Sequence, residues 1–214
     1  MRHRSATLLV LFCAIAGADE PGKLGGSLGV YLNHDRALGS GVLQAIQREV
    51  EAAMFPSGVE ITWQDGLRPE VFDRVAVIHL RGDCRPDAPI PASIRLSRSD
   101  AEPLGQTQVV DGSILPIADV QCDAVRKFVD RDMQAAPAAD RDELLGRALG
   151  RVTAHELYHI LLRTRRHSRE GLAKPAQTSA ELLTPRSAFA GVDRHKLSES
   201  ASSDVTDSVA ETGR

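Results

Sequence analysis

The chain has 214 residues, a formal net charge of −3 and 42% hydrophobic residues. This length and apolar content fit one globular domain that can bury its own core. A charge this close to neutral argues against a dedicated nucleic-acid-binding protein, which usually carries a strong basic excess.

The first residues have the pattern of a secretory signal. A basic start with Arg2 and Arg4 precedes an apolar run over 6–16, and Ala16-Gly17-Ala18 supplies small residues for cleavage. We therefore predict a signal peptide at 1–18, a mature domain at 19–197 and a secreted or periplasmic location. The run is short for a bilayer span, so we expect no membrane contact after cleavage; an uncleaved anchor is the alternative.

The predicted export of the chain also affects the expected oxidation state of its cysteines. Cys13 lies within the predicted signal, which leaves Cys84 and Cys122 in the mature chain. Two cysteines in an oxidising compartment favour one disulfide, with two separate buried thiols as the alternative. No C-x-x-C pair is present, so a zinc site built from cysteines is not expected.

The first half of the chain predicts strands separated by one helix. Apolar residues at helical spacing predict a helix over 40–54, ended by Pro56 and Gly58. Strands are expected over 28–32, 59–64 and 75–80, the last covered on both faces because it is almost entirely apolar. A hairpin with a tight Asp111-Gly112 turn should join 107–110 to 113–117.

The second half predicts two helices and a polar tail. The first should span 119–133 and bury Val120, Val125, Phe128 and Val129. The second should open with a capping box of Asp140 and Glu143 and reach about Thr164. Residues 198–214 contain few apolar side chains, and we expect them to be disordered. The whole pattern indicates the α+β class, with one twisted sheet backed by helices.

A metal-binding motif lies in the second of these helices. His155 and His159 are four residues apart, so a helix projects both from one face and lets both reach one ion. Neutral imidazole is a good zinc ligand. Glu156 is displaced around the helix, where its carboxylate can accept a proton from a zinc-activated water.

A catalytic zinc usually takes three protein ligands, and His167 is our first candidate for the third. Eight residues of helix advance about 12 Å, so His167 can reach the ion only if the helix ends near Arg163 or Thr164 and the chain folds back. The arginines at 163, 165 and 166 suit a helix C-terminus, where cations meet exposed carbonyls.

The segment from His155 to Ser168 resembles the zincin metallopeptidases, and in particular the metzincin pattern with a third histidine after a turn. It is also similar to uncharacterised secreted bacterial proteins with the same H-E-x-x-H helix and a later His-Ser pair. The resemblance implies a zincin-like domain with His155, His159 and His167 as zinc ligands and Glu156 as catalytic base. Leu162 stands where metzincins carry glycine, and no methionine follows Met133.

Other third ligands remain open. In gluzincin-type peptidases a glutamate from a following helix completes the site, and Glu181 lies at a suitable distance along the chain. Glu170 is nearer, His195 is a further possibility, and a site without a third protein ligand also stays open.

The sequence therefore predicts a zinc-dependent metallopeptidase that acts on a peptide or protein substrate, with Glu156 as general base. The alternative is an exported zinc-binding or interaction module without catalysis. A fourth protein ligand would favour that alternative, whereas an open coordination position would favour the enzyme. The oligomeric state is not predicted.

Overall fold

The computed structural model describes residues 27–64, 72–96 and 103–211. The predicted signal peptide at 1–18 and Cys13 lie outside these ranges. Strands are β1 (Ser27–His34), β2 (Glu60–Gln64), β3 (Arg74–Arg81), β4 (Gly105–Val110) and β5 (Ser113–Gln121). Helices are α1 (Ser40–Met54), α2 (Ala92–Leu96), α3 (Cys122–Ala135), α4 (Arg141–Leu161), α5 (Ser179–Leu183) and α6 (Gly191–Glu211), with 3₁₀ turns at Phe55–Ser57 and Ala138–Asp140.

The five strands form one mixed sheet in the order β2-β1-β3-β5-β4. β1 is parallel to β2 and β3, and β3 is parallel to β5. β4 pairs antiparallel with β5 at the edge of the sheet, joined by the predicted turn, in which Asp111 and Gly112 both have positive φ. The α+β class is confirmed, and α1 and the hairpin turn fall where the sequence predicts them.

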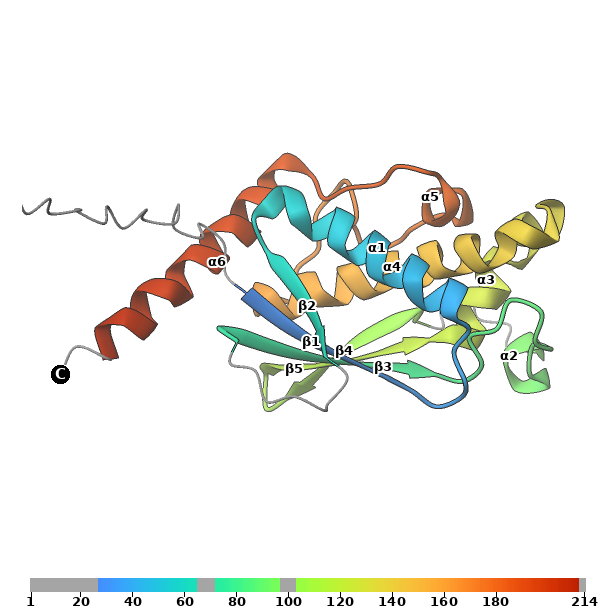
Figure 1. Ribbon diagram of the computed structural model, residues 1–214, viewed down its shortest axis with the longest axis horizontal. Helices are drawn as coiled ribbons and strands as arrows, with labels where there is room; N and C mark the ends of the chain where they lie inside the picture. Colours follow the sequence, from blue (N-terminus) through green and yellow to red (C-terminus); the bar gives the residue numbers. More distant parts are fainter. Residues whose placement is uncertain (1–26, 65–71, 97–102, 212–214) are drawn as a thin grey trace, which may run out of the picture.

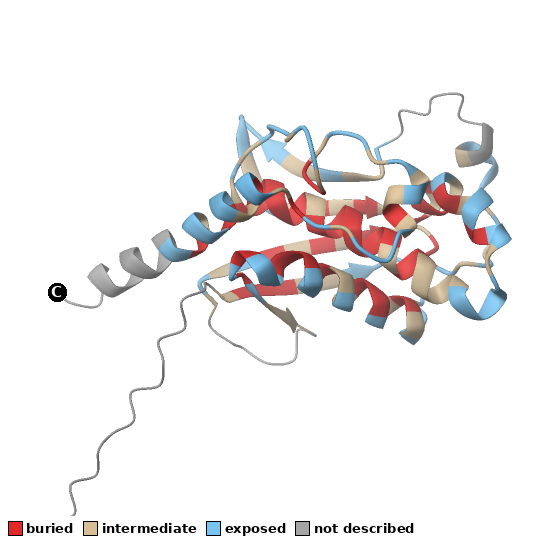
Figure 2. Ribbon diagram, turned by 90° about the horizontal axis from the view of Figure 1, so that it is seen from above, coloured by how far each residue is buried: buried red, intermediate tan, exposed pale blue. Residues whose placement is uncertain are grey.

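α1 and α4 lie on one face of the sheet, whereas α6 extends away from one end of it (Figure 1). α1 packs along α4, and α4 in turn contacts β3, β4 and β5. Buried residues concentrate where this helical layer meets the sheet (Figure 2). The close approach of α1 and α4 needs Gly146, because a Cβ there would lie 2.4 Å from the Ala45 Cβ and 2.7 Å from the Val42 carbonyl oxygen.

Three predictions about β3 and α3 are wrong. β3 is not covered on both faces: Val75 is 41% exposed, because the helices cover only one face and the strand buries alternate residues such as Ile78. The predicted helix over 119–133 begins only at Cys122, because β5 continues to Gln121 and carries Val120 into the sheet. Phe128 is 39% exposed rather than buried.

The predicted ends of the last two elements also differ. Asp140 precedes α4 but makes no side-chain capping bond, and Glu143 instead pairs with Arg147 at 2.9 Å. α6 runs to Glu211 and so includes most of the predicted tail at 198–214, whose last three residues lie outside the described ranges. The first turns of this helix are fixed on the core by Leu197 and Ala201, both buried, so the helix extends from an anchored base.

The predicted disulfide is present. Cys84, just after β3, is bonded to Cys122 at the start of α3. None of the helices in the described ranges combines the length and the apolar content needed to cross a membrane.

Candidate metal centre

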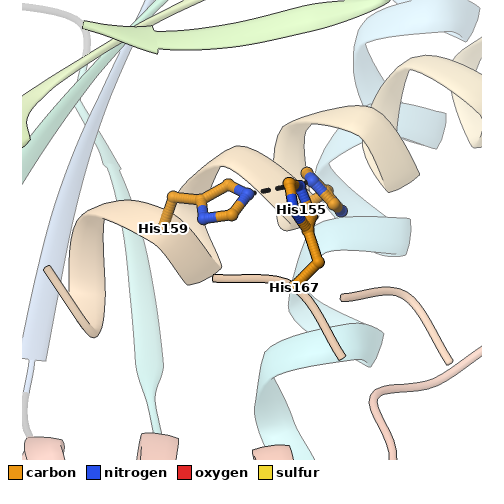
Figure 3. A group of neighbouring side chains, drawn as sticks. All are labelled: His155, His159 and His167. Carbon is orange, nitrogen blue, oxygen red and sulfur yellow. Dashed lines mark hydrogen bonds between the residues drawn. The ribbon is translucent and has the colours of Figure 1, made fainter. Parts of the chain in front are cut away.

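His155 and His159 occupy one face of α4. His159 is buried and His155 is half-buried. Their Nε2 atoms are 3.0 Å apart, joined by the dashed line in Figure 3. Two nitrogens bound tetrahedrally to one zinc at about 2.0–2.1 Å would be separated by about 3.3 Å, so the pair is already spaced as two ligands.

His167 joins them because the chain reverses directly after α4. The helix ends at Leu161, close to the point that His167 requires. Arg163 N donates to the Ile160 carbonyl and Thr164 N to the His159 carbonyl, the two bonds of a Schellman motif, with Arg163 at φ +46°. The returning chain stacks the ring of His167 on that of His155, with centroids 5.2 Å apart. One ligand nitrogen from each histidine then lies within 4.8 Å of the others, close enough for one metal ion.

Backbone carbonyls fix the tautomers of the two helical histidines. His155 Nδ1 lies 2.7 Å from the Leu172 carbonyl oxygen, and His159 Nδ1 lies 2.7 Å from that of Thr164. A carbonyl can only accept, so both Nδ1 atoms carry the proton and both Nε2 atoms present lone pairs. Two lone pairs 3.0 Å apart repel each other, and a cation between them removes that repulsion. The donor set therefore fits a metal ion.

The pKa values of the two helical histidines are lowered. For His155 the main cause is burial, which the hydrogen bond to the Leu172 carbonyl opposes and the neighbouring His167 reinforces. For His159 the main cause is again burial, followed by the electrostatic effect of the neighbouring His155. A metal ligand must be deprotonated, so these shifts favour binding near neutral pH.

Glu156 is buried beside the cluster and is held by the edge strand. Its Oε2 accepts a hydrogen bond of 2.7 Å from Thr107 Oγ1 on β4. Burial raises the pKa of Glu156, and the Thr107 bond opposes this shift. β4 can approach so closely because residue 105 is glycine: a Cβ there would lie 2.7 Å from Glu156 Oε1.

A second network anchors the segment that carries His167, and the sequence did not predict it. Asp193, in the first turn of α6, is fully buried and accepts hydrogen bonds from Ser168 Oγ at 2.6 Å and Tyr158 Oη at 3.3 Å. Lys196 Nζ lies 3.6 Å from the same carboxylate. Ser168 and Tyr158 are sequence neighbours of His167 and His159, so Asp193 ties both ligand-bearing segments to α6.

An open cleft of about 790 Å³ exposes the cluster. It runs along α4 between β4 and the segments 164–167 and 174–177, with α3 at one end. Apolar side chains including Leu104, Val152 and Phe128 line it, and the three histidines and Glu156 lie in its wall. The exposure of Phe128, which the sequence pattern assigned to the core, follows from its position in this wall.

The structure places the other candidate ligands elsewhere. The Glu181 carboxylate forms a capping box with Thr178 and an ion pair with Lys174; the Lys174 hydrogen bond is the main reason that its pKa is lowered to about 2. His195 is exposed on α6 and lies 3.2 Å from Glu199. Glu170 is exposed. In the described ranges, the cluster that could hold a metal consists of His155, His159 and His167.

Comparison of the chain with protein-family models, curated proteins and solved structures finds no match.

Proposed function

We propose that this protein is a zinc-dependent hydrolase that cleaves peptide bonds. The observation that carries the proposal is the convergence of the Nε2 lone pairs of His155 and His159, joined by His167, beside the buried carboxylate of Glu156 in an open cleft. Three histidines with no carboxylate among the ligands suit zinc better than magnesium or calcium, which prefer oxygen.

Glu156 and Thr107 have separate roles in the proposed hydrolysis. When bound, zinc lowers the pKa of water to about 7 and polarises a carbonyl. Glu156 accepts the proton of the attacking water and passes it to the leaving amine. The raised pKa of Glu156 suits a group that must both take and return a proton near neutral pH. Thr107 keeps this carboxylate on the cleft side of α4 through its hydroxyl.

The cleft favours the enzyme over the non-catalytic zinc module. A structural zinc site is normally closed by a fourth protein ligand, whereas within the described ranges three residues form the cluster. Among the described residues of the cleft wall, the one carboxylate is that of Glu156, and it is engaged by Thr107. An extended peptide fits a cleft bounded by an edge strand, since one side of β4 is unpaired within the described residues.

Secretion is part of the same proposal. The Cys84–Cys122 disulfide is typical of proteins that fold in an oxidising compartment. This agrees with export directed by residues 1–18.

The test combines metal content with peptide hydrolysis. Purified protein should hold about one zinc per chain, and so should Glu156→Gln and Glu181→Ala, whereas His167→Ala should lose it. Glu156→Gln should lower turnover of a peptide mixture about 10³-fold, because the general base is removed. A chelator should abolish turnover, and added zinc should restore it.

Two results would contradict the proposal. Wild-type protein without zinc or another divalent metal, purified in the absence of chelators, would remove the metal centre. Full turnover by Glu156→Gln would remove Glu156 from the role of general base.

A further inference from the structure

The loop after α4 is strongly cationic. Residues 162–170, which we call the arginine loop, contain Arg163, Arg165, Arg166 and Arg169, all exposed, and Glu170 as the sole carboxylate. The whole chain has 26 basic and 29 acidic residues, so this concentration of positive charge does not follow from composition. Within the described ranges, none of these four arginines has an ion pair or a side-chain hydrogen bond.

Capping of α4 does not account for these arginines. The last four carbonyls of the helix already have partners: Leu162 N, Thr164 N and Arg163 N donate to the carbonyls of residues 158, 159 and 160. Ser200 Oγ donates to the fourth, at Leu161, at 3.0 Å. The arginine side chains are therefore available to a ligand.

Arg165 belongs to the wall of the cleft. It lies beside Thr164 and His167, at the end of the cleft where α4 ends. Lys127, Lys174 and Arg151 also line the cleft, and Glu156 is the sole carboxylate among the lining residues that the structure describes. The described part of the wall thus carries four cations against one acid, in a protein with a negative net charge.

Two of the four cations are compensated from outside the cleft. Arg151 Nε is paired with Glu49 at 2.6 Å, and Lys174 is paired with Glu181. Arg165 has no such partner in the described ranges. The fourth cation, Lys127, is engaged by the Ile94 carbonyl, to which its Nζ donates at 2.7 Å. The Arg165 guanidinium is therefore the group in the wall best placed to bind an incoming carboxylate, with two parallel hydrogen bonds.

We propose that the cleft selects acidic peptides and that Arg165 binds a substrate carboxylate at the end of the cleft where α4 ends. This inference rests on the proposed peptidase function and names its substrate class. The remaining arginines of the loop attract acidic peptides over a longer range and raise the rate of encounter.

Binding measurements test this inference without relying on catalysis. The protein is zinc-loaded Glu156→Gln, and the probes are three fluorescein-labelled peptides that differ only by Glu, Gln or Lys at the same positions. By fluorescence anisotropy, the Glu peptide should bind about tenfold more tightly than the Gln peptide at about 50 mM salt, and the advantage should shrink at about 300 mM. The Lys peptide should bind most weakly.

Two variants with the same change in net charge test whether the preference for the Glu peptide depends on Arg165. Arg165→Glu, in the same background, should abolish the preference for the Glu peptide. Arg131→Glu changes the net charge equally at an exposed position of α3 that does not line the cleft, and it should keep the preference. The zinc content of each variant is measured to show that the metal centre is intact.

Equal affinity for the three peptides, no binding of any peptide, or an equal loss in Arg131→Glu would overturn the inference. These results are distinct from failure of the proposed function, which is measured separately as zinc content and Glu156-dependent turnover of the wild type. Equal affinities together with both of those properties would remove only the acidic substrate class.

Discussion

Arg163 controls the turn on which the third histidine depends. Its φ of +46° lies in the left-handed region that favours glycine, and it occupies the position where a Schellman motif most often has glycine. The motif aims the Thr164 carbonyl at His159 Nδ1 and starts the return of the chain toward His167. Arg163 thus occupies a position that normally requires glycine, and its left-handed conformation strains the backbone.

Arg163→Gly should raise the stability of the protein. Relief of the left-handed conformation is worth about 1–2 kcal/mol, partly offset by the greater freedom of glycine in the unfolded chain, so we expect a net gain of about 1 kcal/mol. Thermal unfolding of the zinc-free protein measures it. Arg166→Gly is the control, since Arg166 lacks positive φ and the same change there should not stabilise. Equal effects of both substitutions would show that residue 163 is not strained.

Elements whose residues signal their own boundaries could be predicted from sequence. α1 matches its prediction because apolar spacing and Pro56 define it, and the Asp111-Gly112 turn needs only local backbone preferences. Elements that depend on distant contacts were missed. β5 extends beyond its predicted end at residue 117, because an apolar residue such as Val120 fits a sheet as well as a helix face. α6 extends beyond residue 198, and its N-terminal part packs on the core.

The same distinction holds within the candidate site. His155, Glu156 and His159 are found by spacing alone, because one helix positions all three. His167 is close in sequence but needs a turn whose usual glycine is absent. Asp193 contacts Ser168 across 25 residues, and no short-range pattern could connect the two.

Ser168→Ala tests whether α6 positions the third ligand. The substitution removes the hydrogen bond of 2.6 Å to buried Asp193. Loss of such an outer partner typically weakens metal binding about 10–100-fold, and we expect the lower end because Ser168 adjoins the ligand rather than touching it. Competition with a zinc chelator gives the affinity, and circular dichroism shows whether the fold is retained.

Ser179→Ala is a matched control for that substitution. Ser179, in α5, also donates to an aspartate, Asp132, at 2.5 Å, and neither residue belongs to the histidine cluster. It should leave zinc affinity unchanged. If the two variants bind zinc equally well, Asp193 stabilises α6 without positioning His167.

At the scale of the whole molecule, the disulfide joins the sheet to the wall of the cleft. Cys84 follows β3, and Cys122 begins α3, which contributes Lys127 and Phe128 to the cleft. Neither cysteine lies in the metal cluster. The bond should therefore support the stability of the fold, and through it the shape of one end of the cleft, without changing the ligand geometry directly.

Replacing both cysteines by alanine should lower the free energy of unfolding by about 3–4 kcal/mol. The bond closes a loop of 38 residues, and its main effect is to restrict the unfolded chain. Urea unfolding of the zinc-free protein measures the loss, while chelator competition should show zinc affinity within about twofold of the wild type under native conditions. The three histidines are held by α4, its Schellman turn and the Ser168–Asp193 bond, none of which includes a cysteine. A large loss of zinc affinity in a variant that remains folded would mean that the cluster depends on the α3 wall as well as on α4 and α6.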